Sequence, residues 1–560
     1  MSPHKILRLF HTVRHLKAEQ VIYRLYYKFK TVRLTERGEY RQRGWPAAWS
    51  DPELLPTTMV GYNRFEFLGE TGDIHDQEAW NDPKKSKLWL YNLHYMDDLN
   101  SVSAELRHEA HKNLVDRWIA ENPPATGSGW EPYPLSLRIV NLVKWFSRQK
   151  AIEPIWLKSL GLQAQALYKQ LEFHILGNHL MANAKAMIFA GAFLEGDEAQ
   201  KWLNKGLRIL DREIPEQFLP DGGHFERSPM YHAILLGDLC DLLNLAERSG
   251  IIDLKERISD WRERVARGLS WLATMSHPDG RIAFFNDAAF GIAPDLEAIK
   301  TYAKRLGCKV EPALPRSLQG EGKVSLRRLE NTGYYRVDLP GDGVCLLDLA
   351  EIGPDYLPGH GHADTLSFEL SIFGQRVFVN SGTSQYGEGV ERLRQRGTAA
   401  HNTVVIDDED SSEVWGGFRV ARRAYPNKPL ISEDDKSLVI EASHDGYKRI
   451  RNGVIHQRSW NFTSRSLVIQ DWITGDFQTA EARFHLHPDV RIDRSHFSGY
   501  RLLLPSAPTK TVNFSVQGAK NVERVASQWH PKFGTSVPNI CIAIKFTGRH
   551  LTTRIEWGDL

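Results

Sequence analysis

The spacing of apolar residues changes once along the chain, near residue 310. Between about 100 and 310, apolar residues recur every three or four positions, as in Leu160, Ala164, Leu167 and Leu171, which is the period of an amphipathic helix. Beyond residue 324 the chain has short β-rich runs such as TLSFELSI and SLVIQDWI, separated by Gly, Asp, Asn and Ser, and these predict antiparallel strands. Helices followed by strands indicate two large domains rather than a mixed α/β sheet.

The expected fold class is therefore multidomain α + β. Residues 86–312 are predicted to form stacked helical hairpins, and residues 313–560 antiparallel sheets packed as a sandwich. Residues 1–85 are predicted to be a basic helical segment and a lead-in. No fixed-period repeat is visible, so a repeat solenoid is not predicted. The junction between the two domains is the place where we expect a ligand site.

The N-terminal segment has a pattern of its own. Ile6, Leu7, Phe10, Val13 and Leu16 recur at helical spacing with Lys and Arg between them. A helix that packs on its own domain is the favoured interpretation, with attachment to a membrane surface as the alternative. The segment lacks the order of a secretion signal, so a cytoplasmic location is expected by default and a periplasmic one stays open. No apolar run reaches the roughly 18 residues that an integral membrane helix needs.

Composition narrows the classes of partner. The 560 residues include 71 Lys and Arg against 69 Asp and Glu, a net charge of +2. This balance gives no global field for nucleic acid, so nucleic acid is not an expected partner and an anionic partner would need a local basic patch. The four cysteines have no CxxC spacing, which argues against a disulfide framework or a thiolate zinc site. The oligomeric state is left open.

Four polar clusters place titratable rings beside small residues: GNH at 177–179, SPMYH at 228–232, GHGHAD at 359–364 and RGTAAHNT at 396–403. In GHGHAD the spacing of two would put His360 and His362 on one side of an extended strand, or splay the two rings if the segment turns. Such a pair suits a metal ion or a shared substrate, and a hydrogen-bonded surface loop is an equally good interpretation.

A metal site is chemically feasible around the third and fourth clusters. Asn380 ends the run RVFVN and His401 precedes the run NTVVID, so both can lie at one edge of the same sheet as His362. Imidazoles suit zinc, and an amide carbonyl supplies an oxygen ligand. Asp364 is an alternative source of charge, or it orients a histidine ligand.

Seven motifs, taken in order, resemble the heparinase II/III family of polysaccharide lyases, to which alginate lyases are similar in architecture: LWLYNLHYMDDLN, WEPYPLSLRIVN, GNHLMANA, DGGHFERSPMYH, GHGHADTLSFEL, FVNSGT and RGTAAHNTVVID. The resemblance runs from about residue 88 to 420. It implies an incomplete (α/α) toroid followed by antiparallel β-sheets. It also implies β-elimination, in which the proton beside a uronic carboxylate is removed and the 4-linked sugar is expelled.

The resemblance implies catalytic roles for four residues. Asn178, with His179 beside it, is implied as the group that neutralises the uronate carboxylate, and Tyr231 with His360 as the base and acid pair. Which ring takes the proton stays open. A free tyrosine has a pKa near 10, so it would need a cation, a metal or an anionic partner to act as a base.

The resemblance implies one divalent metal ion, with zinc as the favoured species, at His362, Asn380 and His401. Relatives generally have an aspartate where this chain has Asn380. The substitution removes a negative ligand, so we expect a weak site. We expect the ion to organise the sheet and position His360 rather than to attack the substrate.

An acidic polysaccharide needs positive and aromatic side chains at its binding surface. Arg396 is a candidate because a guanidinium makes forked contacts with carboxylate or sulfate, and Tyr133 is a candidate for stacking on sugar rings. The further predicted substrate-binding residues are Arg138, Glu226 and His232.

The leading functional hypothesis is a polysaccharide lyase acting on an acidic, uronate-containing polymer. Because no export signal is seen, the cell's own exopolysaccharide is an expected target. One alternative is a glycoside hydrolase on the same helical toroid, with Asp221 and Glu226 as its two carboxylates. Another is a non-catalytic polysaccharide-binding or assembly factor.

Overall fold

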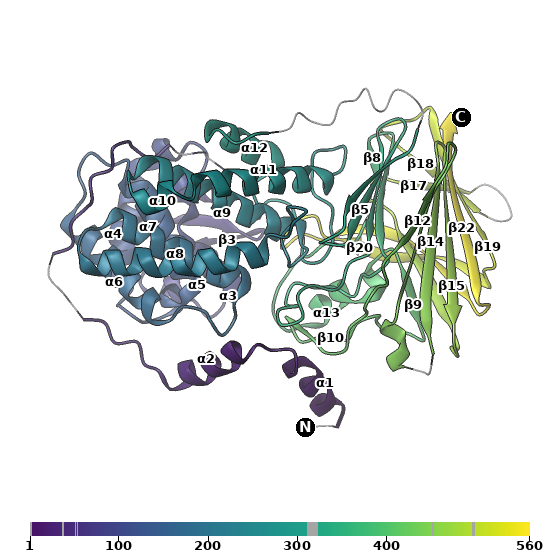
Figure 1. Cartoon of the computed structure of the whole chain (residues 1–560), viewed down its shortest axis with the longest axis horizontal. Helices are drawn as coiled ribbons and strands as arrows, with labels where there is room; N and C mark the ends of the chain where they lie inside the picture. The colour runs from purple at the N-terminus through teal and green to yellow at the C-terminus, as the bar shows by residue number, and fades with distance from the viewer. Residues whose placement is uncertain are drawn as a thin grey trace.

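The computed structural model describes residues 3–35, 39–50, 52, 54–310, 323–450, 453–494 and 499–559. Most helices lie on one side of the molecule and most strands on the other, as Figure 1 shows. The predicted mixed class of helices followed by sheets is therefore confirmed. The predicted domain boundary between residues 312 and 313 lies outside the described residues.

Ten α-helices between residues 87 and 305 build the helical half: α3 (Lys87–Tyr95), α4 (His108–Glu121), α5 (Pro132–Phe146), α6 (Pro154–Lys169), α7 (Gly177–Phe193), α8 (Asp197–Gln217), α9 (Pro229–Arg248), α10 (Ile252–Lys255), α11 (Ile258–Thr274) and α12 (Leu296–Arg305). Of these, α7 is the central helix, and His179 is its one residue that is not buried. Gly206 of α8 allows a close approach to α7, because a Cβ there would lie 2.7 Å from the carbonyl oxygen of Ala184.

Smaller elements surround these helices. Two helices precede them, α1 (Pro3–Val13) and α2 (Ala18–Phe29). A small sheet of β1 (Met59–Gly61), β2 (Arg64–Phe67) and β3 (Glu70–Asp73) lies in the region predicted as a lead-in. The short 3-10 turns of the helical half are η1 (Glu78–Asn81), η2 (Asp97–Asn100), η3 (Ala104–Arg107) and η4 (Ser128–Trp130).

The strand half contains three larger antiparallel sheets. The five-stranded sheet has the order β4 (Ser325–Leu329), β5 (Tyr334–Leu339), β6 (Gly343–Asp348), β7 (Phe368–Ile372) and β8 (Gln375–Phe378). The four-stranded sheet has the order β20 (Asn521–Trp529), β21 (Val537–Phe546), β16 (Ala480–His485) and β9 (Val404–Ile406). The eight-stranded sheet has the order β12 (Leu430–Glu433), β13 (Leu438–His444), β14 (Ile455–Thr463), β15 (Ser466–Thr474), β22 (His550–Asp559), β19 (Lys510–Gln517), β18 (Gly499–Leu503) and β17 (Arg491–Arg494).

One apolar core joins the three sheets. The ring of Phe378 in β8 lies 5.8 Å from that of Phe484 in β16, which lies 5.2 Å from that of Phe514 in β19. Along β15, buried and partly buried residues alternate, as expected for a strand with one face on a core. Between β8 and β12 lie α13 (Val390–Arg396), η6 (Thr398–Ala400), β10 (Val414–Trp415) and β11 (Arg419–Val420), and η7 (Gly446–Arg449) follows β13.

Polar contacts fix the two halves against each other. Arg336 of β5 donates from Nη1 to the carbonyl oxygens of Thr274 and Ser276, at 3.0 and 2.6 Å, at the end of α11. His277 Nε2 lies 2.8 Å from a carboxylate oxygen of Glu369 in β7. A side chain at the start of α7 or α9 therefore keeps a defined position relative to the loops of the strand half.

Candidate active site

Residues from both halves meet at one cluster. Asn178 lies in the first turn of α7, Tyr231 in the first turn of α9, and His360 in the loop between β6 and β7. Asn178 Nδ2 lies 3.3 Å from His360 Nε2. The ring of Tyr231 stacks on that of His360, with centroids 3.8 Å apart and planes 28° apart. The structure thus brings these three predicted catalytic residues into direct contact.

Local backbone features place the two helical residues. Gly177 has φ +56°, and a Cβ there would lie 2.2 Å from a side-chain carbon of Leu357 and 3.0 Å from Glu226 Oε1, so this position requires glycine. At the start of α9, Ser228 Oγ accepts a hydrogen bond of 3.2 Å from the backbone N–H of Tyr231. This N-cap and the following proline begin α9 at a fixed point.

Asp287 organises the cluster from within the protein. Its Oδ2 lies 2.9 Å from His360 Nδ1, its Oδ1 lies 2.9 Å from His362 Nε2, and Arg392 donates to both oxygens. Burial alone would raise the pKa of this carboxyl, but Arg392 and the two imidazoles hold it well below its usual range. Asp287 is therefore a fixed negative charge beneath the site.

The Asp287 carboxylate also fixes the tautomer of His360. An ionised carboxylate only accepts hydrogen bonds, so His360 Nδ1 carries the proton that is shared with it. The lone pair of Nε2 then faces Asn178 and Glu226, whose Oε2 is 3.6 Å away. The His360 side chain is 11% exposed. Nε2 is thus in position to accept a proton.

Glu226 is paired with Asn178. Its Oε1 accepts hydrogen bonds from the side-chain Nδ2 and from the backbone N–H of Asn178, at 3.2 and 3.3 Å. Burial raises the pKa of Glu226, although His360 and Asn178 oppose the shift. The other amide atom, Asn178 Oδ1, has no hydrogen-bond partner among the described residues. Glu226, predicted from the sequence to bind substrate, thus lies inside the cluster.

His179 and Tyr133 form the more exposed side of the cluster. Their rings lie 4.4 Å apart, and the His179 side chain is 30% exposed. His179 Nδ1 lies 2.9 Å from Glu172 Oε1. Burial lowers the pKa of His179, but the Glu172 carboxylate raises it by more, so the net shift is upward. An imidazole with a raised pKa beside a tyrosine ring suits an anionic sugar.

Tyr231 keeps its proton. Its hydroxyl lies 3.0 Å from that of Tyr386 in the loop after β8. Burial, the neighbouring tyrosines and Asp287 raise the pKa of Tyr231 well above its ordinary value. The phenol is therefore a proton donor in this arrangement. Reasoning from the sequence missed Tyr386, and it missed Asp287 in the segment FFNDAAF, where one carboxylate among apolar residues is the only signal.

Three predicted substrate-binding residues lie elsewhere, which corrects the prediction. Each of these side chains is fully buried. Arg396 donates from Nε and Nη2 to the carbonyl oxygen of Gly361, at 3.0 and 2.9 Å, and so supports the GHGHAD loop. Arg138 donates to the carbonyl oxygens of His94 and Gly129. His232 Nε2 lies 2.9 Å from the carbonyl oxygen of Gly268. All three side chains therefore make structural contacts and do not lie at the cluster.

The predicted metal ligands have atoms without partners. His362, Asn380 and His401 are buried, and the rings of His362 and His401 lie 5.3 Å apart. Among the described residues, no hydrogen bond reaches His362 Nδ1, either ring nitrogen of His401, or Asn380 Nδ2. Orphaned buried nitrogens are costly, so the free imidazole nitrogens of His362 and His401 fit a divalent ion, whereas the ligating atom of Asn380, its carbonyl oxygen, accepts a hydrogen bond of 3.3 Å from the Asn402 N–H. The set has no anionic member, and no group of three His, Cys, Asp or Glu in the described part of the chain is arranged for a metal.

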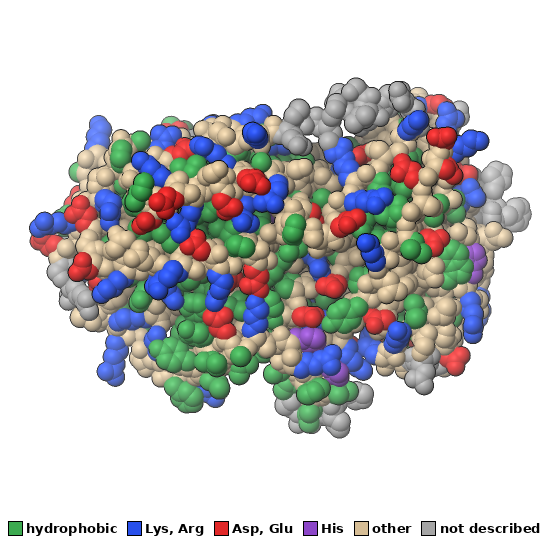
Figure 2. Space-filling model, viewed as in Figure 1, with side chains coloured by type: hydrophobic (Ala, Val, Ile, Leu, Met, Phe, Trp, Pro, Cys, Tyr) green, Lys and Arg blue, Asp and Glu red, His purple; other side chains and the backbone are tan. Residues whose placement is uncertain are grey.

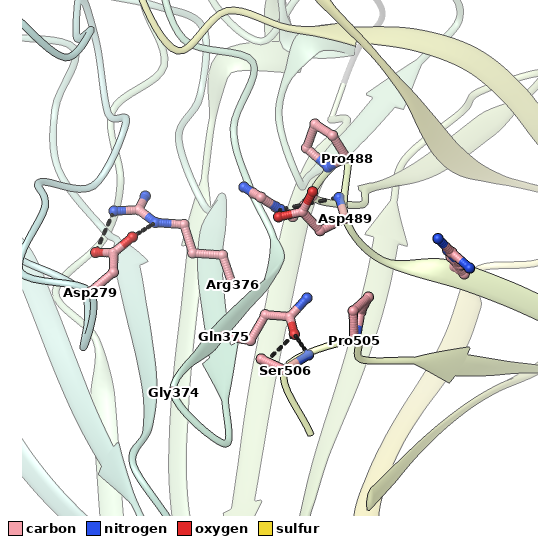
Figure 3. A pocket seen from close by; sticks show the side chains of 10 residues that line it. Asp279, Gly374, Gln375, Arg376, Pro488, Asp489, Pro505 and Ser506 are labelled. Atoms are coloured by element: carbon pink, nitrogen blue, oxygen red, sulfur yellow. Dashed lines mark hydrogen bonds and ion pairs between the residues drawn. The ribbon is translucent and has the colours of Figure 1, made fainter. Parts of the chain in front are cut away.

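A cavity of about 670 Å³ is lined by residues of the strand half together with Asp279, and none of the cluster residues is part of its wall (Figure 3). Its wall includes Arg376, which is paired with Asp279 at 2.8 Å, and Gln375, which accepts a hydrogen bond from Ser506. No catalytic candidate lines it, so we do not place the reaction there.

Comparison with known proteins identifies the family. The model of the heparinase II/III N-terminus matches residues 56–305, and that of the heparinase II/III-like C-terminal region matches residues 322–558. A heparin-sulfate lyase of Bacteroides stercoris is 30% identical over 476 residues, which cover 76% of this chain and 67% of that protein. The chain belongs to the heparinase II/III family. The enzyme class implied by the sequence motifs, a polysaccharide lyase, is thereby confirmed at the level of the family.

Other proteins match this chain with lower identity. A heparin-sulfate lyase of Bacteroides thetaiotaomicron is 25% identical over 64% of this chain, and the match spans 54% of that protein. The FtsZ-localized protein C of Caulobacter vibrioides is 23% identical over 76% of this chain and 73% of its own length. A crystal structure of heparinase III shares the fold, with a TM-score of 0.68, 19% identity, and coverage of 97% of this chain and 89% of that one.

Proposed function

We propose that this protein cleaves a uronate-containing polysaccharide by β-elimination, with glycosaminoglycans as its substrate class. The observation that carries the proposal is the meeting of Asn178, Tyr231 and His360 from two halves of the chain. The heparin-sulfate lyases among its relatives support the substrate class.

The first requirement of the reaction is to acidify the carbon beside the uronate carboxylate. Negative charge develops on that carboxylate in the transition state, and donors fixed in advance stabilise it there. Asn178 supplies such a donor through its side-chain amide, and Glu226, which accepts hydrogen bonds from that amide and from the Asn178 backbone N–H, holds it in place. His179, whose pKa the Glu172 carboxylate raises, lies at the exposed edge of the cluster and favours an anionic group there.

Two stacked rings then carry out the two proton transfers of the reaction. His360 Nε2 takes the proton from the carbon beside the carboxylate, and Asp287 stabilises the imidazolium that forms. The electron pair of that C–H bond forms the new double bond as the C4–O bond breaks. Tyr231 donates its hydroxyl proton to the departing oxygen. The products are an unsaturated uronate and a free hydroxyl on the expelled sugar, and return of the proton from His360 to Tyr231 restores the enzyme.

We also propose a divalent ion, with zinc favoured, at His362, Asn380 and His401. The unpartnered imidazole nitrogens of His362 and His401 support it. The ion would supply positive charge that orders these ligands near the His360 loop. For the fold, we propose that the helical half is an incomplete (α/α) toroid and the strand half a β-sandwich. For the biological context, we propose that the protein is cytoplasmic and acts on the cell's own exopolysaccharide.

A non-catalytic assembly factor is the second candidate, because one relative of similar coverage is named as an FtsZ-localized protein and not as a lyase. A glycoside hydrolase is disfavoured by the place of Asp221. Its carboxylate accepts hydrogen bonds from the backbone N–H groups of Gly223 and Thr332 and from the Thr332 hydroxyl, so it is occupied as a connection between the two halves.

A panel of uronate polymers tests the proposal. We expect ultraviolet absorbance from an unsaturated product on at least one glycosaminoglycan, and loss of that signal in Tyr231→Phe and His360→Ala. Tyr302→Phe is the matched control, since it removes a buried phenol bonded to Asn244 and Asp241 away from the cluster. New reducing ends without absorbance would indicate a hydrolase, and polymer binding without cleavage an assembly factor; either result would contradict the proposal.

A further inference from the structure

The two N-terminal helices present apolar side chains to solvent. On α1 these are Ile6, Leu7, Leu9, Phe10 and Val13, and on α2 they are Val21, Ile22, Leu25, Tyr26 and Phe29. On each helix the exposed set recurs at intervals of three and four residues, so it forms one stripe. Phe29 is 81% exposed and Ile22 63%. The helix pattern was predicted from the sequence, but these stripes do not pack on the domain.

The opposite sides of the same helices hold them to the protein. On α2, Tyr27 donates to the carbonyl oxygen of Leu171, and the ring of Tyr23 stacks on Phe173 at 4.8 Å. On α1, Thr12 accepts a hydrogen bond of 3.1 Å from Trp415 Nε1. The helices are thus fixed with their apolar stripes outward. They lie along one edge of the molecule, α2 beside the helical half and α1 beside the strand half (Figure 1).

The same segment concentrates positive charge. Residues 3–35 contain eight Lys and Arg and one Glu, a net +7, whereas the whole chain is +2, so the remainder is −5. Arg24 and Lys28 follow the spacing of the polar side of α2 and flank its apolar stripe. In Figure 2, hydrophobic and basic side chains lie together at the lower edge, where Figure 1 shows α2. A second copy of this face would meet it with like charge.

We infer that the outward stripes of α1 and α2 form a docking surface for a membrane that contains anionic lipids. Apolar side chains of short interfacial helices enter the boundary between headgroups and acyl chains, while flanking Lys and Arg contact anionic headgroups. The surface would lie on the bilayer without crossing it. Among the described residues, no helix is long and apolar enough to span a membrane.

The docking surface is connected to the catalytic cluster. Gln20 of α2 is buried, and its side-chain amide donates to the carbonyl oxygens of Ile175 and Tyr356, at 3.3 and 3.2 Å. Ile175 precedes Asn178 by three residues, and Tyr356 precedes His360 by four. A membrane bound through α1 and α2 would therefore hold the cluster at a fixed orientation to the lipid surface.

Vesicle co-sedimentation with the purified full-length protein tests the inference. We expect binding to vesicles of phosphatidylcholine mixed with phosphatidylglycerol, weaker binding to phosphatidylcholine alone, and weakening as salt is raised. Arg24→Ala and Lys28→Ala should each reduce the affinity about fivefold. The triple variant Phe10→Glu, Ile22→Glu and Phe29→Glu should reduce it more than tenfold.

Two controls make the result decisive. Leu106→Glu and Leu430→Glu change side chains that are 81% and 72% exposed outside the docking surface, and they should leave vesicle binding unchanged. All these positions are on the surface, so thermal unfolding should stay close to that of the unmodified protein. Absence of binding to anionic vesicles would overturn the inference, as would binding that the triple variant retains. Self-association of the protein that the triple variant abolishes, without vesicle binding, would overturn it in favour of a second copy.

Discussion

Replacing Asp287 by Asn tests whether this carboxylate positions His360. Its Oδ2 accepts from His360 and Arg392, and its Oδ1 accepts from His362, Arg392 and, at 3.3 Å, the Thr383 hydroxyl. An amide would turn one oxygen into a donor that faces two other donors. Breaking such a buried pair costs about 3–5 kcal/mol of stability. With the acceptor of His360 Nδ1–H lost, we expect kcat to fall between about 10²-fold and 10⁴-fold.

The assay follows the absorbance of the unsaturated product, corrected for the folded fraction. KM should change little, because the side chain of Asp287 is fully buried and does not reach substrate. Asp471→Asn is a matched control, since that buried carboxylate also bonds an arginine and a histidine, Arg458 and His456, within the eight-stranded sheet. It should lose similar stability and keep kcat. An Asp287→Asn variant with the kcat of the control, or with a raised KM alone, would refute the reasoning.

Four further outcomes follow from the structure. Tyr231→Phe should lower kcat by about 10²-fold to 10⁴-fold with near-normal thermal unfolding, since only the hydrogen bond to Tyr386 is lost. Gly177→Ala should cost about 1–3 kcal/mol in chemical denaturation, because φ is +56° and a Cβ would meet Leu357. Burial lowers the pKa of His232 from 6.5 to about 4. As the pH falls, the unfolded chain therefore takes up a proton on this imidazole before the folded protein does. The free energy of unfolding should therefore fall by about 2 kcal/mol more between pH 7 and pH 5 than it does in His232→Gln. Metal analysis should find a divalent ion in the protein and less of it in His401→Ala, whereas equal content would exclude the site at His401.

The sequence predicted the elements and the central residues of the site for different reasons. Periodicity marked the long helices and the strands because each has one face on a core. Asn178, Tyr231 and His360 stood out because each lies in a short polar motif. Asp287 did not stand out, because a single carboxylate in an apolar segment has no local pattern. Its ion pair is made with Arg392, which lies 105 residues away in the sequence.

Charge alone misled the prediction of substrate contacts. Arg138 and Arg396 lie in motifs of the family, but a guanidinium with five donors also satisfies buried carbonyl oxygens, and only the fold shows which occurs. The N-terminal helices are a related case. Their spacing revealed an apolar stripe along α1 and α2, but periodicity does not tell what covers a stripe, and here the described protein leaves it exposed.

Product analysis on purified protein with a glycosaminoglycan panel is the most direct test of the central claim. The account predicts an absorbing unsaturated uronate with the unmodified protein, and none when Asn178, Tyr231 or His360 is replaced in a variant that still folds. Intact polymer after prolonged incubation across the panel, or cleavage that persists without these three side chains, would contradict it.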